Sequence, residues 1–330
     1  MIALTSLRAN GPLLSLIVGL TLISSAARAQ TVFRVDAYPI PTVTLTQTQF
    51  LKGEKNGEAT TVAGILRVPG PLTVIEKKPA VILLSGLGGA NSAHEDWAAE
   101  LLSLGVAVFT LDSFGGRKLY TLAEHARLAS LARMLDAFAA VEILKGNPRV
   151  DASRIAIMGL SGGAVAALYS SNKRFTHAFG PPDFQFAAHV VLYAPCHIRL
   201  NNDAETTGKP IRLFHGIADD WTPIGPCRSY VERLKKAGAD VSLAEFPDAH
   251  HAYDLPMFKQ VLQFTNATSV RNCVLEEGPD GVVLNSKTGK PFGGGDACLE
   301  KGPHLGYNAA AHQATVQSVK AFLKHTFRLP

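Results

Sequence analysis

The chain has 330 residues, of which 47% are hydrophobic and 18% are charged, with a formal net charge of +5 at pH 7. This length and apolar content suffice to bury one large core, and no internal repeat or low-complexity tract interrupts the sequence. So mild a charge does not argue for nucleic-acid binding. We therefore expect a single domain that does not act on nucleic acid.

The first residues carry the pattern of an export signal. Arg8 and Arg28 are accompanied by no acidic residue, and the apolar stretch 13–23 is short for a membrane span. Ala27-Arg28-Ala29 fits the small-x-small rule of signal peptidase. The sequence predicts a signal peptide over residues 1–29 and a periplasmic or secreted mature chain, 30–330, without a stable membrane anchor.

In chain order, apolar runs alternate with helix-length segments. Segments 42–50 and 61–68 alternate in polarity and predict two antiparallel strands at a sheet edge. The predicted buried strands are 80–84, 106–111, 155–158, 188–193 and 211–214, with 241–246 as the last. The predicted helices are 98–104, 122–145, 163–170, 227–237 and 314–327. This alternation predicts an α/β fold, with a mainly parallel twisted sheet and helices on both faces.

One segment, 154–167, reads as a strand, a very tight turn and a helix. Gly159, Gly162 and Gly163 surround Ser161 in that turn. Such glycines let a strand and a helix approach closely and leave the serine exposed at a helix N-terminus, as in a nucleophile elbow. There the N–H of Gly162 can stabilise negative charge on a substrate oxygen. An ordinary glycine-rich turn is the alternative.

Two later loops carry the groups that would activate this serine. Loop 215–223 contains Asp219 and Asp220, and loop 246–253 contains His250 and His251. Ligands of open parallel sheets bind beyond the carboxyl ends of the strands, where all three loops are expected. An imidazole must take the serine proton, and a carboxylate must orient that imidazole. We assign Ser161 as nucleophile, His251 as base and Asp219 as orienting acid, while Asp220 and His250 remain open alternatives.

The loop after the strand 80–84 is expected to complete the site. It reads Ser85-Gly86-Leu87-Gly88-Gly89. In α/β hydrolases the corresponding loop supplies a second oxyanion donor. The N–H of Leu87 is our prediction, paired with that of Gly162, and Gly88 is the neighbouring alternative.

Four cysteines are present, namely Cys196, Cys227, Cys273 and Cys298. None forms a C-x-x-C pair, so a zinc or thioredoxin-like site is poorly supported and no metal is expected. Two disulfides suit an exported chain, although four cysteines allow three connectivities. We favour Cys196–Cys227 and Cys273–Cys298 because each pair brackets one local segment, with free buried thiols as the alternative.

The segment 266–307, called the excursion below, breaks the alternation of strand and helix. It is rich in Gly, Asn and Pro, contains Cys273 and Cys298, and is too long for an ordinary connection. It directly follows the His250-His251 region. Two interpretations stand side by side, a disulfide-tied surface segment and a flap beside the active site.

From about residue 80 to 253 the chain resembles the dienelactone hydrolase family. The matching pieces are ILLSGLGG, LDSFGGR, VDASRIAIMGLSGG, HGIADDWTP and FPDAHHAYD. The resemblance implies the α/β-hydrolase fold. Relatives commonly place the acid four residues after the His of the HG turn and the base just before a small-aromatic pair, which selects Asp219 and His251.

The departures from this family bear on the substrate. Enzymes that hydrolyse dienelactone itself use cysteine where this chain has Ser161, so dienelactone is not the expected substrate. Ser85 stands where many relatives have histidine. Arg117 lies near a position that can hold a substrate carboxylate, with a surface arginine stabilising its turn as the alternative. Trp221 and Phe114 either wall the acyl pocket or pack in the core.

Together these features predict an exported serine hydrolase of small-molecule carboxylic esters or lactones. It would act through an acyl-serine intermediate, without a metal or organic cofactor. A serine peptidase or acyltransferase on the same fold is the alternative, since the same residues serve amides and other acceptors. A non-catalytic binding protein on a hydrolase scaffold is the alternative from another class. The oligomeric state does not follow from the sequence.

Overall fold

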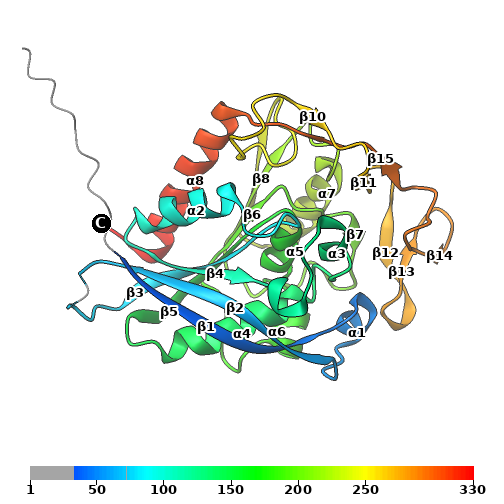
Figure 1. Cartoon of the computed structure of the whole chain (residues 1–330). Coiled ribbons are helices and arrows are strands. Elements are labelled where there is room, and N and C mark those ends of the chain that lie inside the picture. The colour runs from blue at the N-terminus through cyan, green and yellow to red at the C-terminus, as the bar shows by residue number, and fades with distance from the viewer. Residues whose placement is uncertain (1–32, 72) are drawn as a thin grey trace, which may run out of the picture. The chain divides into compact units, whose positions relative to one another are not determined.

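An eight-stranded sheet organises the chain in the computed structural model, which describes residues 33–71 and 73–330 (Figure 1). In spatial order its strands are β1 (Phe33–Thr44), β2 (Glu58–Pro69), β4 (Ala107–Asp112), β3 (Lys78–Leu84), β5 (Val150–Leu160), β6 (His189–Leu192), β8 (Ile211–Gly216) and β9 (Val241–Phe246). β2 pairs antiparallel with β1 and β4, and all other neighbours pair in parallel. The mainly parallel sheet with an antiparallel edge is thus confirmed.

Helices cover both faces of this sheet because successive strand residues point to opposite sides. In β3, Val81 and Leu83 belong to one buried apolar cluster, and Ile82 and Leu84 belong to the other. α2 (Ser92–Leu102) and α8 (Ala309–Phe327) pack in the first cluster. The second cluster receives α4 (Arg133–Gly146), α5 (Gly162–Tyr169) and α7 (Ile224–Lys236). The core therefore lies in two layers, one on each side of the sheet.

Two predicted elements are wrong in part. The predicted strand 42–50 overlaps β1 only at residues 42–44, since β1 begins at Phe33 and stops at Thr44, and helix α1 (Gln47–Lys52) follows. Thr46 and Gln49 form a capping box there, which satisfies the free N–H groups of a helix start. Local capping thus overrides the alternating pattern on which the strand prediction rested.

The predicted helix 122–145 is divided into α3 (Leu122–His125) and α4. The buried ring of His125 lies within hydrogen-bond distance of the carbonyl oxygens of Leu87 and Leu119, at 2.6 and 3.1 Å. The contact with Leu87 holds the end of α3 against the loop after β3, and the chain turns before α4 begins. Helix α6 (Lys173–Phe179), which follows α5, was not predicted.

The excursion folds into short strands beside the main sheet. Its strands β12 (Leu275–Glu277), β13 (Val283–Asn285) and β14 (Lys290–Pro291) form a small sheet with β7 (Ile198–Arg199), as the orange ribbons of Figure 1 show in part. The other short elements are β10 (Leu262–Gln263), β11 (Thr268–Ser269), β15 (Glu300–Lys301), β16 (His304–Leu305) and the 3-10 helices η1 (Gly115–Arg117) and η2 (Pro279–Gly281).

Both predicted disulfides are present, Cys196–Cys227 and Cys273–Cys298. The second closes the excursion on itself, and the pair indicates an oxidising compartment. The predicted signal peptide, residues 1–29, lies outside the described residues. Within the described part of the chain, no helix is long and apolar enough to cross a membrane.

Candidate active site

Ser161 occupies the sharp turn between β5 and α5. Its backbone angles are φ 51° and ψ −117°, a conformation that non-glycine residues adopt only under strain. A Cβ on Gly159 would lie 2.3 Å from the carbonyl oxygen of Gly163, and a Cβ on Gly163 would lie 2.4 Å from that of Ser85. The two glycines are therefore required for the close approach of strand and helix that presents the Ser161 hydroxyl.

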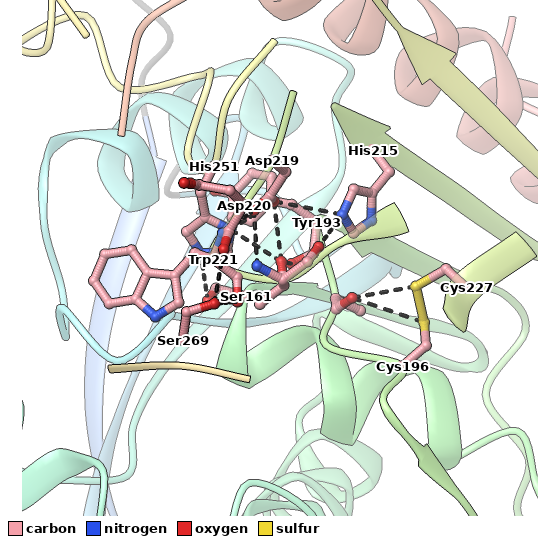
Figure 2. Close-up of polar contacts among 12 residues, drawn as sticks. Ser161, Tyr193, Cys196, His215, Asp219, Asp220, Trp221, Cys227, His251 and Ser269 are labelled. Atoms are coloured by element: carbon pink, nitrogen blue, oxygen red, sulfur yellow. Dashed lines mark hydrogen bonds and ion pairs between the residues drawn. A yellow bond between two sulfur atoms is a disulfide. The ribbon is translucent and has the colours of Figure 1, made fainter. Parts of the chain in front are cut away.

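The structure brings Ser161, His251 and Asp219 into one line of contacts (Figure 2). The Oγ atom of Ser161 lies 2.9 Å from Nε2 of His251, and Nδ1 of His251 lies 2.7 Å from Oδ2 of Asp219. An ionised carboxylate only accepts hydrogen bonds, so Nδ1 of the neutral imidazole carries the proton. Nε2 is then left free to accept the proton of Ser161.

Asp219 is 3% exposed, and both of its carboxylate oxygens accept hydrogen bonds. The N–H groups of Trp221 and Thr222 donate to its Oδ1 at 3.0 and 2.8 Å, and the Thr222 hydroxyl donates to Oδ2 at 3.0 Å. Burial by itself raises the pKa of the Asp219 carboxyl, but the facing rings of His251 and His215 outweigh it. The net pKa lies well below its usual value, so Asp219 is ionised at neutral pH.

Sequence reasoning missed Thr222 and His215, although both stand in the predicted acid loop. An Asp whose side chain accepts from the N–H groups two and three residues later is an Asx turn, and Asp219 to Thr222 has that spacing. Nε2 of His215 lies 2.7 Å from the carbonyl oxygen of Thr222 and 3.4 Å from Oδ2 of Asp219. These contacts fix the loop that carries the acid.

The alternatives Asp220 and His250 point elsewhere. Asp220 accepts from the Arg271 guanidinium at 2.6 Å and from both the backbone N–H and the ring of His304 at 2.8 Å. The ring of His250 lies beside that of His304, with centroids 6.1 Å apart. The geometry therefore groups Asp219 and His251 with the serine, while Asp220 ties its loop to the excursion.

The loop after β3 lies against the start of α5, as predicted for an oxyanion site. A Cβ on Gly86 would lie 3.2 Å from Cβ of Ser161, and one on Gly162 would lie 3.2 Å from the side chain of Leu87. The carbonyl oxygen of Leu87 is bound by the ring of His125 at 2.6 Å. Backbone from both elements thus borders the serine hydroxyl.

A cavity of about 440 Å³ opens at these groups, and Ser161, Gly162 and His251 line it. Its apolar walls include Leu87, Leu122, Trp221, Phe258, Phe264 and Leu305. Phe114 does not line it, but is buried with its ring stacked on His125 at a centroid distance of 3.8 Å. Among the described residues, no group of three or more His, Cys, Asp or Glu is arranged to hold a metal ion.

Arg117 does not reach this cavity. Its guanidinium makes two 2.8 Å bonds to the carboxylate of Asp136 and also donates to Thr44 and to the Ser113 carbonyl. The side chain is 5% exposed. The structure directs the Arg117 guanidinium to Asp136 rather than to the cavity, which disfavours the predicted contact with a substrate carboxylate.

A buried network behind His251 was also missed by sequence reasoning. Asp254 is fully buried and accepts from Trp97 Nε1 at 2.7 Å and from the Tyr193 hydroxyl at 2.9 Å. Burial raises the pKa of this carboxyl. The Tyr193 ring meets the His251 ring edge to face, with centroids 5.0 Å apart. Asp254 thereby positions the tyrosine that supports the imidazole, and only its place three residues after His251 hinted at this role.

Both features considered for the excursion are present: it borders the cavity, and a disulfide closes it on itself. Thr268, Val270 and Leu305 line the cavity, and Leu305 bridges to the backbone of His251. The Ser269 hydroxyl lies 2.7 and 3.2 Å from the carbonyl oxygens of Asp220 and Trp221. The excursion is therefore fastened directly to the loop that carries Asp219.

The sheet order, the elbow and the strand-end loops define an α/β hydrolase. A family model described as "Dienelactone hydrolase family" matches residues 67–268, and the chain belongs to that family. It is a hydrolase of the ester and lactone type that acts on small molecules. A search of curated protein sequences found no match.

Solved structures of the same fold include a dienelactone hydrolase-like promiscuous phosphotriesterase, P91, from metagenomic libraries. It shares 15% identity with this chain at a TM-score of 0.56, covering 89% of this chain and 99% of that one. A putative dienelactone hydrolase from Klebsiella pneumoniae has 14% identity, coverage of 88% and 98%, and a TM-score of 0.53. An esterase from Thermogutta terrifontis has 17% identity, coverage of 82% and 91%, and a TM-score of 0.51.

Proposed function

We propose that the protein is an exported serine hydrolase that cleaves a carboxylic ester or lactone through an acyl-serine intermediate. The observation that carries this proposal is the run of contacts from Ser161 Oγ through His251 to Asp219, at 2.9 and 2.7 Å. A serine hydroxyl becomes a competent nucleophile when a positioned imidazole accepts its proton. Export is supported by the N-terminal pattern and by the two disulfides.

In the first half-reaction, Ser161 Oγ attacks the carbonyl carbon while its proton passes to Nε2 of His251. The resulting imidazolium is stabilised by the Asp219 carboxylate, which stays ionised. The N–H groups of Gly162 and Leu87 hold the oxyanion. When the tetrahedral intermediate collapses, the bond to the alcohol oxygen breaks and His251 protonates the leaving alcohol, which leaves an acyl-serine ester.

In the second half-reaction, water replaces the alcohol. His251 accepts one water proton as the hydroxyl oxygen attacks the acyl carbon, and the same oxyanion donors act again. Collapse breaks the bond to Ser161 Oγ, His251 returns the proton to the serine, and the carboxylic acid departs. Asp219 holds the imidazole in one tautomer through both halves.

One of the fold relatives supplies a chemical precedent. The Thermogutta terrifontis esterase 2 is described as phosphorylated by paraoxon and, in another structure, as bound to propionate. An organophosphorus probe is therefore a suitable reagent here, because an activated serine reacts at phosphorus as it does at a carbonyl carbon.

The test is labelling by a fluorophosphonate probe. The wild-type protein should be labelled, and Ser161→Ala should abolish labelling and ester hydrolysis alike. Ser130→Ala is the matched control and should keep the labelling, because Ser130 lines the same cavity while the hydroxyl within hydrogen-bond distance of Nε2 of His251 is that of Ser161. Absence of labelling in folded wild-type protein would contradict the proposed function.

A further inference from the structure

The cavity at Ser161 has a lining without formal charge. Its twenty-seven lining residues, all within the described part of the chain, include no Lys, Arg, Asp or Glu. Its volume of about 440 Å³ falls in the range of sites that enclose a small organic molecule. A substrate group that enters it loses water and meets mainly aliphatic and aromatic side chains.

Two further histidines line the cavity, and neither supplies a cation at neutral pH. Burial lowers the pKa of His197 to about 4 and lowers that of His94 below its usual value. Nδ1 of His94 and Nδ1 of His197 have no hydrogen-bond partner among the described residues. Neutral imidazoles can bind a neutral polar group, but they do not balance a carboxylate.

The side chains of Arg117 and Arg133 are buried outside the cavity. Arg117 is paired with Asp136 and lines a different surface hollow. Arg133 is fully buried, its Nη2 donates to the Ser85 carbonyl at 2.8 Å, and its guanidinium lies 4.7 Å above the ring of Phe114. Its Nε and Nη1 have no hydrogen-bond partner among the described residues. Neither side chain lines the cavity. A buried anion is strongly disfavoured unless it is paired, so this geometry penalises a charged acyl or alcohol group.

One wall of the cavity is aromatic. The ring of Trp221 lies 5.9 Å from that of Phe264, which meets Phe258 edge to face at 5.8 Å. Val270 and Leu305 of the excursion continue this wall. Rings and branched aliphatic groups of this kind favour an apolar chain or ring in the substrate.

We propose that the substrates are esters or lactones whose acyl and alcohol parts are both uncharged and mainly apolar, and that the cavity discriminates against a carboxylate on either part. This inference rests on the proposed function. It adds a rule of charge selection that is set by the cavity walls rather than by the catalytic groups.

Three 4-nitrophenyl esters of equal acyl chain length form the test: the hexanoate, the hemiadipate with a free terminal carboxylate, and the methyl ester of the hemiadipate. We expect kcat/KM for the hemiadipate to be at least 100-fold below that for the hexanoate, because the cavity offers no partner to the anion. Capping the carboxylate as its methyl ester should restore most of the loss, which separates charge from size.

A second test adds a positive charge to the cavity. Thr268 is exposed at the cavity and lies in β11 of the excursion, so Thr268→Arg adds a cation there. It should raise the ratio of hemiadipate to hexanoate kcat/KM at least tenfold. Thr268→Met, with a long uncharged side chain, should leave that ratio within twofold of wild type. Fluorophosphonate labelling of Ser161 verifies that each variant is folded.

The outcomes are distinguishable. If hemiadipate and hexanoate are hydrolysed with kcat/KM values within tenfold of each other, the charge rule is overturned and the serine hydrolase stands. The rule also fails if Thr268→Met alters the ratio as much as Thr268→Arg does. If no ester is hydrolysed and the probe does not label the folded protein, the proposed function falls and the charge rule falls with it.

Discussion

The strand ends of the main sheet and the excursion contribute to the same cavity in different ways. The main sheet carries the three catalytic candidates, since Ser161, Asp219 and His251 follow β5, β8 and β9. These strands are packed between two buried apolar layers. The excursion has strands of only two or three residues, of which β14 and β15 are exposed, while Leu275 and Val283 of β12 and β13 pack in the core. It is also held by one disulfide and by polar contacts to the acid loop. The rigid frame carries the chemistry, and the tethered segment shapes part of the wall that meets the substrate.

The largest expected effect separates the two neighbouring acids. Asp219→Asn should lower kcat by about 10⁴-fold, because the amide no longer fixes the His251 tautomer or stabilises its charged form. Asp220→Asn, the matched control, should change kcat less than about fivefold, since its partners are Arg271 and His304 of the excursion. Steady-state kinetics with one neutral ester tests this, and the reverse order of effects would transfer the catalytic role to Asp220.

The second prediction compares a glycine from each region. Gly163→Ala should destabilise the protein by about 3 kcal/mol, because its Cβ would lie 2.4 Å from a backbone oxygen of Ser85. Gly295→Ala in the excursion should change stability by less than about 0.5 kcal/mol, since nothing lies within 4 Å of its Cβ. Denaturant unfolding gives both values, and equal values would show that the elbow is not tightly packed.

The third prediction concerns pH and the sheet region. Burial lowers the pKa of His189, at the start of β6, from 6.5 to about 4. Between these values the unfolded chain binds a proton that the folded chain excludes, so stability falls as pH falls through this window. Lowering the pH from 7 to 4.5 should therefore lower the free energy of unfolding by about 2 kcal/mol through this histidine.

The variant His189→Gln should flatten that part of the pH dependence, because glutamine keeps a donor for the Ala167 carbonyl but does not titrate. His325→Gln, at an exposed position near the end of α8, serves as the control for removing a histidine. The test is the free energy of unfolding of the wild type and both variants, measured at several pH values. If the free energy of unfolding of His189→Gln depends on pH as strongly as that of the wild type, groups other than His189 cause the pH dependence.

The smallest expected effect comes from loosening the excursion. Replacing both Cys273 and Cys298 by serine should raise KM for the hexanoate ester about tenfold, because the segment carrying Val270 and Thr268 loses its covalent tie. The kcat for a small acetate ester should stay within about threefold, since the bonds of His251 to Ser161 and Asp219 do not involve the excursion. A loss of kcat as large as that of Asp219→Asn would contradict the division between the two regions.

Much of the frame could be predicted from sequence because its signals are local. The apolar runs located the central strands, and the glycines around Ser161 located the elbow. The two errors have different causes, one local and one tertiary. The capping box at Thr46 cut short a predicted strand, and the contact of His125 with the distant carbonyl oxygen of Leu87 accompanies the break in a predicted helix.

The sequence by itself determined the order of elements and the serine with its two loops, and it favoured a disulfide pairing confined to local segments. The family resemblance favoured Asp219 over Asp220, and the tertiary structure supplied the separate partners of the two carboxylates, His251 for Asp219 and Arg271 with His304 for Asp220. The tertiary structure also paired Arg117 with Asp136 and left the cavity without a charged side chain. Such pairings join residues that are distant in sequence, and their chemistry depends on which partners burial brings within reach.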